Sequence, residues 1–106
     1  MAAVGDEPVV APDLLGPEVV STLRALERRG KVTTARAETA LRRFERAPVQ
    51  RVKTANLLAR TWELRHNVSA YDGCYVALAE LLDARLVTAD GALSKAPGIK
   101  VPIALV

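Results

Sequence analysis

The sequence predicts an α/β fold, in which brief strands alternate with amphipathic helices. A weakly alternating segment at 48–52, a short β-branched run at 85–88 and a last apolar stretch at 101–106 are separated by segments whose apolar residues recur at helical spacing. This alternation is typical of α/β proteins. The chain has 106 residues, half of them apolar, which suffices for one modest core. We therefore expect residues 1–106 to form a single domain.

Two helices are expected in the first half of the chain. The first opens at Gly16-Pro17-Glu18, because proline suits the first helical position and an acid suits the first turn. It closes at Arg28-Arg29-Gly30, which supplies terminal cations and a terminating glycine. Thr33 or Thr34 then caps the second helix. The predicted inward residues are Val19, Val20, Leu23 and Leu26 on the first helix, and Ala37, Leu41 and Phe44 on the second. The two helices should form a tight hairpin.

The second half should contain two further helices and two strands. A helix from about 55 to 66 follows the strand near 48–52, and its predicted inward residues are Leu57, Leu58, Thr61, Trp62 and Leu64. The most apolar helix begins at Ser69 and ends near Leu82, with a predicted buried side of Tyr71, Cys74, Tyr75, Leu78, Leu81 and Leu82. It should be the central helix. Pro102 suits an edge position for the last strand, at 101–106.

Two carboxylates lie where an α/β fold can bind metal or phosphate. Ser69 is a natural N-cap, and Asp72 follows at capping-box spacing, in the first turn near the positive end of the helix dipole. Asp90 lies just beyond the carboxyl end of the strand at 85–88, the edge where α/β sheets gather ligands. Brought together, these two acids could hold Mg²⁺, which prefers oxygen ligands.

Positive charge is concentrated in one segment. Residues 24–53 contain ten basic residues and three glutamates, a net charge of +7. Because the net charge of the whole chain is +3, the remaining residues have a net charge of −4. A basic helical pair beside an acidic half suits a protein that attracts a polyanion and cuts it at a metal. A solvated arginine-rich face is the equal alternative, because no aromatic residues interleave with the charges as stacking platforms.

Other candidate features indicate structural roles. The single cysteine, Cys74, cannot form an internal disulfide, and its apolar neighbours favour inert core packing. His66 is placed to complement a helix dipole rather than to catalyse. The sequence has no run of eighteen apolar residues and no basic, then hydrophobic, leader pattern, so we expect a cytoplasmic protein without membrane contact.

Four stretches together resemble a PIN-domain toxin of the VapC type. They are Pro12-Asp13-Leu14-Leu15-Gly16-Pro17-Glu18-Val19, Trp62-Glu63-Leu64-Arg65, Ser69 to Glu80, and Leu86-Val87-Thr88-Ala89-Asp90. The resemblance covers almost the whole chain. It implies a short, central, mostly parallel sheet flanked by helices, and a Mg²⁺- or Mn²⁺-dependent endoribonuclease with an RNA substrate. It also implies a VapB-type antitoxin partner and a second copy of the chain.

The resemblance assigns roles to particular acids. Glu18 matches the family's second acid, Asp72 its third and Asp90 its fourth, and all three are implied metal ligands. Thr88 occupies the polar position beside the last acid, and Ser69 the cap that orients Asp72. With Asp72 as the expected direct ligand, Asp90 and Glu18 would complete the shell or orient the attacking water.

One departure from the family concerns the N-terminus. The family begins with a hydrophobic strand that ends in aspartate and is followed by a helix, whereas the first residues here resemble the loop ahead of the second structural unit. The resemblance therefore implies an incomplete, N-terminally truncated domain without the central strand and first acid. A partner chain, strand exchange or a rearranged sheet using Val9-Val10-Ala11 would have to satisfy the exposed backbone groups. We expect an intermolecular solution.

Three functions therefore stay open. The first is a ribonuclease toxin, and the second is a catalytically inactive PIN-like remnant that binds an antitoxin. The third takes residues 18–47 as a helix-turn-helix nucleic-acid binder, on the strength of their basic character. Loss of metal-dependent RNA cleavage in Asp72→Asn would favour the first.

Overall fold

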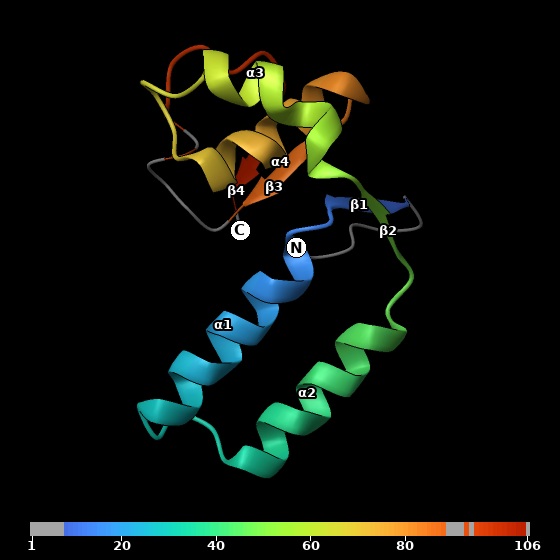
Figure 1. Ribbon diagram of the computed structural model, residues 1–106, viewed down its shortest axis with the longest axis vertical. Helices are drawn as coiled ribbons and strands as arrows, with labels where there is room; N and C mark the ends of the chain where they lie inside the picture. The colour runs from blue at the N-terminus through green and yellow to red at the C-terminus, as the bar shows by residue number, and fades with distance from the viewer. Residues whose placement is uncertain (1–7, 89–92, 94, 106) are drawn as a thin grey trace.

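The computed structural model describes residues 8–88, 93 and 95–105. Helices and short strands alternate along these residues, as the α/β prediction requires (Figure 1). The elements are β1 (Val9–Pro12), α1 (Leu15–Arg28), α2 (Thr34–Arg46), β2 (Val49–Val52), the 3₁₀ turn η1 (Thr54–Leu57), α3 (Leu58–Glu63), α4 (Ala70–Leu81), β3 (Leu86–Thr88) and β4 (Ile103–Leu105).

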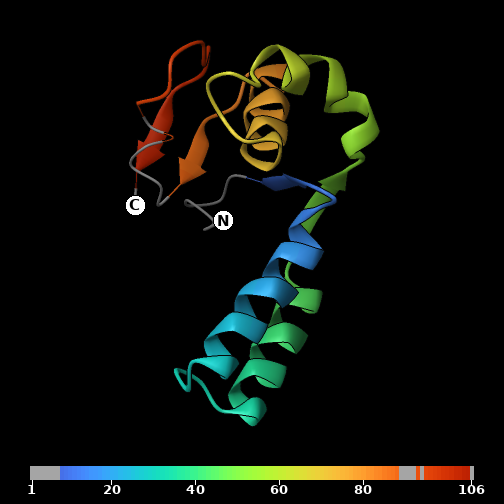
Figure 2. The same ribbon diagram turned by 60° about the vertical axis from the view of Figure 1, so that its left-hand side comes forward.

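Helices α1 and α2 form the predicted hairpin, which extends away from the strands and from α3 and α4 in both views (Figures 1 and 2). Gly30 has a φ of +70° just beyond α1, and the Thr33 hydroxyl accepts a hydrogen bond from the Arg36 backbone N–H at 3.2 Å. These are the predicted stop and start signals. Helix α1 begins at Leu15, so Pro17 occupies its third position rather than its first. The first turn tolerates proline because its N–H groups have no helical partner.

The strands form two parallel pairs. Strand β1 pairs with β2, from Val9 opposite Val49 to Pro12 opposite Val52. Strand β3 pairs with β4, from Leu86 opposite Ile103 to Thr88 opposite Leu105. The parallel direction agrees with the prediction, but within the described part of the chain the expected central sheet is two separate two-stranded sheets. Residues 9–11, which offered one way to complete the sheet, belong to β1.

Helix α4 is central, as predicted, because it packs against both strand pairs. One group of buried residues joins α4 to α3 and β3, namely Leu64, Val76, Ala79, Leu86 and Leu93. A second group joins α4 to η1, with β1 and β2 packed against it, namely Leu57, Cys74, Ala77 and Leu78. Gly73 allows α3 to approach closely, since a Cβ atom there would lie 3.0 Å from Thr61 Cγ2. Cys74 is buried, which confirms its predicted core position.

Several predicted core residues lie at the surface instead. On α3 and its flanks, Leu57, Thr61 and Leu64 are buried, whereas Leu58 and Trp62 are exposed, Trp62 by 66%. Both sets have helical spacing, but only one set can face α4. The Trp62 ring instead packs against Arg65, whose guanidinium carbon lies 4.1 Å from the ring centroid.

The buried side of α4 is also shorter than predicted. Its buried residues begin at Gly73 and end at Ala79, so Tyr71 before them and Leu81 and Leu82 after them are exposed. The prediction was wrong for these three residues, because helical spacing alone does not say how far along the helix its packing partners reach.

Candidate functional site

The first turn of α4 holds Asp72 in the predicted geometry. Ser69 is the N-cap, with an extended backbone, and its hydroxyl accepts a hydrogen bond from the Asp72 N–H at 3.1 Å. This bond fixes the start of the helix and therefore the direction in which the Asp72 side chain leaves it. The side chain is half-buried, in the first turn where the helix dipole stabilises negative charge.

Glu18 reaches the same face of α4 from the first turn of α1. The Tyr75 hydroxyl donates a hydrogen bond to Glu18 Oε1, across 57 residues of sequence. Tyr75 follows Asp72 by three positions, a spacing that places both side chains on one side of the helix. The bond therefore brings Glu18 to the face that carries Asp72.

The electrostatics of Tyr75 show that both carboxylates act on it. Burial raises the pKa of the Tyr75 hydroxyl well above its usual range, and the hydrogen bond and charge of Glu18 raise that pKa further, followed by the charge of Asp72. Tyr75 is therefore a protonated donor throughout the physiological pH range. Its ring packs beside the cluster around Leu64 and Val76, which anchors the hydroxyl.

Two carboxylates suit a hard divalent cation. Mg²⁺ is commonly held by one or two carboxylates together with waters and substrate phosphates, so Glu18 and Asp72 fit that donor class. Within residues 8–88, 93 and 95–105, no group of three or more His, Cys, Asp or Glu side chains is placed to hold a metal. The third predicted ligand, Asp90, lies outside the described residues. Thr88 ends β3, as predicted.

Tyr75 is the functional candidate that the sequence analysis missed. Its apolar neighbours led to a core assignment, and its ring does pack against core residues. The sequence feature that could have indicated a role for Tyr75 is its position three residues after Asp72, which places the tyrosine on the same side of the helix as that acid. The partner of that hydroxyl, Glu18, could not be read from local sequence.

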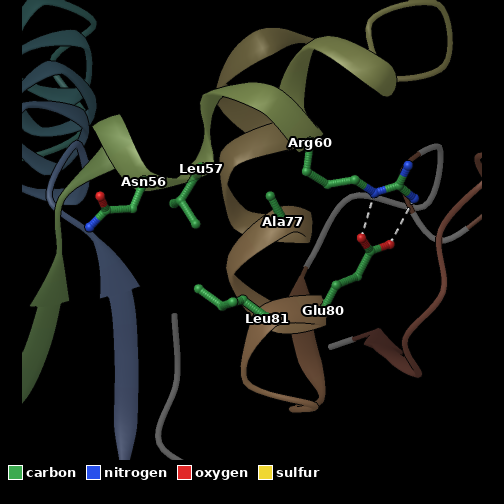
Figure 3. Close-up of a pocket in the computed structure, with 6 residues that line it drawn as sticks. All are labelled: Asn56, Leu57, Arg60, Ala77, Glu80 and Leu81. Atoms are coloured by element: carbon green, nitrogen blue, oxygen red, sulfur yellow. Dashed lines mark hydrogen bonds and ion pairs between the residues drawn. The ribbon is translucent and has the colours of Figure 1, made fainter.

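A second polar cluster near α4 is structural. Arg60 donates from Nε to Glu80 Oε1 at 2.6 Å and from Nη2 to Oε2 at 3.0 Å, and Nη2 also donates to the Gly98 carbonyl at 2.8 Å. This pair borders a pocket of about 280 Å³ (Figure 3), whose lining residues are Asn56, Leu57, Arg60, Ala77, Glu80 and Leu81. Glu80 lies eight residues, or about 12 Å, along the helix from Asp72. The pair thus joins α3, α4 and the segment before β4, away from the acidic face.

The hairpin carries the positive charge. Arg36, Arg42, Arg43 and Arg46 are exposed, and helical geometry places them outside the stripe of Ala37, Leu41 and Phe44 on α2. Phe44 in turn packs under the guanidinium of Arg51, at 5.0 Å from the ring centroid. The outer face of α2 is therefore rich in exposed arginines.

Comparison with known proteins identifies the family. No family model matches the chain. The chain is 41% identical over 103 residues, 97% of its own length and 81% of the relative's, to a protein named ribonuclease VapC9 from Mycobacterium tuberculosis and to one named VapC ribonuclease Mb0985 from Mycobacterium bovis. It is 38% identical over 104 residues to ribonuclease VapC1 of M. tuberculosis, covering 91% of this chain and 73% of that one. In the described part of the chain, no helix is both long and apolar enough to cross a membrane. Similarity at this level over most of both sequences shows that the chain belongs to the VapC family.

Proposed function

We propose that this protein is a metal-dependent endoribonuclease toxin of a VapBC-type pair, which hydrolyses RNA phosphodiester bonds in the cytoplasm. The observation that carries the proposal is the hydrogen bond from Tyr75 to Glu18, which brings a carboxylate from α1 to the side of α4 that carries Asp72. The relatives reported above are named as ribonucleases, which supports RNA cleavage as the proposed activity. The exposed arginines of α2 support a polyanionic substrate.

The proposed mechanism assigns each residue one task. Glu18 and Asp72, with Asp90 as the third proposed ligand, would hold Mg²⁺ or Mn²⁺. When bound, such an ion supplies positive charge to the phosphate and makes water more acidic. Ser69 fixes the start of α4 and so orients Asp72. Thr88 is proposed to act beside Asp90, and the arginines of the hairpin offset phosphate charge as RNA approaches.

The test is metal-dependent RNA cleavage by the Asp72→Asn variant. We expect wild-type protein to cleave RNA with Mg²⁺ or Mn²⁺ and to lose cleavage in EDTA, and we expect Asp72→Asn to reduce the rate by at least about 100-fold, since even ligand-supporting residues typically contribute 10–100-fold. The matched control is Asp83→Asn, which changes an exposed aspartate just beyond the other end of α4. Asparagine tolerates the positive φ of 50° there. Wild-type protein that binds an antitoxin without cleaving RNA would refute the nuclease and favour the inactive binder.

The proposed partners are a VapB-type antitoxin and a second copy of the chain. Large apolar side chains are exposed on α3 and α4 and at the end of α4, namely Leu58, Trp62, Tyr71, Leu81 and Leu82. Exposed apolar surface of this kind is typical of protein interaction sites. Co-expression with the protein encoded beside the gene tests the first partner, and light scattering tests the second.

A further inference from the structure

We propose that Tyr75 is a positioning residue, whose hydroxyl holds the Glu18 carboxylate beside Asp72 so that acids from α1 and α4 act as one divalent-cation site. The inference deepens the proposed function and depends on it. In this proposal Tyr75 supports the acidic residues of the site without binding the metal itself.

The geometry leaves Glu18 dependent on Tyr75. Glu18 lies on α1, the helix that belongs to the protruding hairpin, whereas Asp72 lies on the central helix α4 (Figure 2). Among the described residues, the Tyr75 hydroxyl is the group that hydrogen-bonds the Glu18 side chain. A carboxylate on a flexible glutamate has several rotamers available, so a fixed donor on α4 restricts it to the face that Asp72 shares.

Tyr75 is suited to this task by its own packing. The ring packs against the core cluster of Leu64, Val76 and Ala79, so the hydroxyl has a fixed position on α4. A tyrosine hydroxyl carries one proton to donate. Donation to Glu18 leaves the second carboxylate oxygen of Glu18 available to a cation. Outer residues that hydrogen-bond a metal-binding carboxylate in this way typically contribute 10–100-fold to metal affinity.

The experiment measures Mn²⁺ binding by calorimetry in four proteins: wild type, Tyr75→Phe, Glu18→Gln and the double variant. We expect Tyr75→Phe to weaken Mn²⁺ binding by about 10–100-fold. In the Glu18→Gln background, the same change should weaken binding less than threefold, because Tyr75 acts through Glu18. The matched control is Tyr71→Phe, which removes the same hydroxyl from an exposed residue of α4 and should leave Mn²⁺ affinity within twofold of wild type.

Two further measurements separate positioning from general stabilisation. Thermal unfolding by circular dichroism checks that Tyr75→Phe is folded under the binding conditions, and Phe preserves the packed ring. In metal-free protein, the carboxyl ¹³C resonance of Glu18 should shift in Tyr75→Phe and stay unchanged in Tyr71→Phe.

The outcomes distinguish the two proposals. Wild-type Mn²⁺ binding that is unchanged in Tyr75→Phe, or equal losses in the wild-type and Glu18→Gln backgrounds, would overturn the role of Tyr75 and leave the nuclease proposal standing. Wild-type protein that binds no Mn²⁺ would overturn both proposals together. An unmoved Glu18 resonance in Tyr75→Phe would overturn the contact itself.

Discussion

Replacing Glu80 by glutamine should destabilise the fold by about 2 kcal/mol. Glu80 accepts two hydrogen bonds from Arg60, at 2.6 and 3.0 Å, and one from the Lys100 N–H at 3.1 Å. Exposed ion pairs contribute about 0–1 kcal/mol, and removing one partner of a fully buried pair costs about 3–5 kcal/mol. The Arg60 and Glu80 side chains are 25% and 13% exposed, which places this pair between those limits. Glutamine has nearly the same volume as glutamate, but one of its two terminal acceptor oxygens is replaced by an NH₂ group, which would face the N–H donors of Arg60 or Lys100.

The pH dependence gives the Glu80 prediction a second readout. The hydrogen bond from Arg60 lowers the pKa of the Glu80 carboxyl below its usual range. Because the folded pKa is depressed, the unfolded chain takes up the proton first as pH falls, so the contribution is present above the unfolded pKa of about 4.3 and is lost below it. The difference between wild type and Glu80→Gln should therefore be constant between pH 5 and 7 and shrink on further acidification.

Urea unfolding followed by circular dichroism measures both quantities. The control is Glu63→Gln, because the Glu63 carboxylate lies 3.6 Å from Arg60 Nη1 and is 63% exposed. Its effect should stay below about 0.5 kcal/mol. A Glu80→Gln variant as stable as Glu63→Gln at pH 7, or a difference that persists unchanged at pH 3, would refute the reasoning.

Three further predictions concern the fold and its assembly. Gly98→Ala should lower the free energy of unfolding, measured in urea, more than Gly30→Ala does. Both glycines have a positive φ, which costs about 1–2 kcal/mol in alanine, but only at Gly98 would the added Cβ lie 3.0 Å from another side-chain atom, Asn67 Nδ2. Equal losses in the two variants would contradict this. Trp62→Ser should cost less than about 1 kcal/mol, because the ring is exposed, whereas a loss of 3–5 kcal/mol would indicate a buried ring. Light scattering at micromolar concentration should give a dimer, and a well-behaved monomer would count against assembly through a second copy.

The helix starts and stops were predictable because their determinants are local. The Ser69 cap with Asp72 and the Thr33 cap with Arg36 each join residues three positions apart, so the sequence pattern contains both partners. Gly30 marks the end of α1 for an equally local reason, its positive φ. The short strands near 49–52 and 86–88 also follow from local composition.

Burial was less predictable because it depends on which elements pack together. Leu57 and Leu58 begin two apolar stripes at helical spacing, and nothing local distinguishes the stripe that faces α4. The chain likewise specified strands but not their grouping into two separate parallel pairs, which depends on contacts between distant segments.

For the candidate site, the sequence by itself determined which acidic residues are candidate ligands, that Asp72 lies in the first turn of its helix, and the family to which these patterns belong. Only the tertiary structure decided that Glu18 shares a face with Asp72 and that Tyr75 joins them. The physical reason is range: a cap is made by neighbours within one helical turn. The Tyr75–Glu18 bond joins residues 57 positions apart and exists only once the chain has folded.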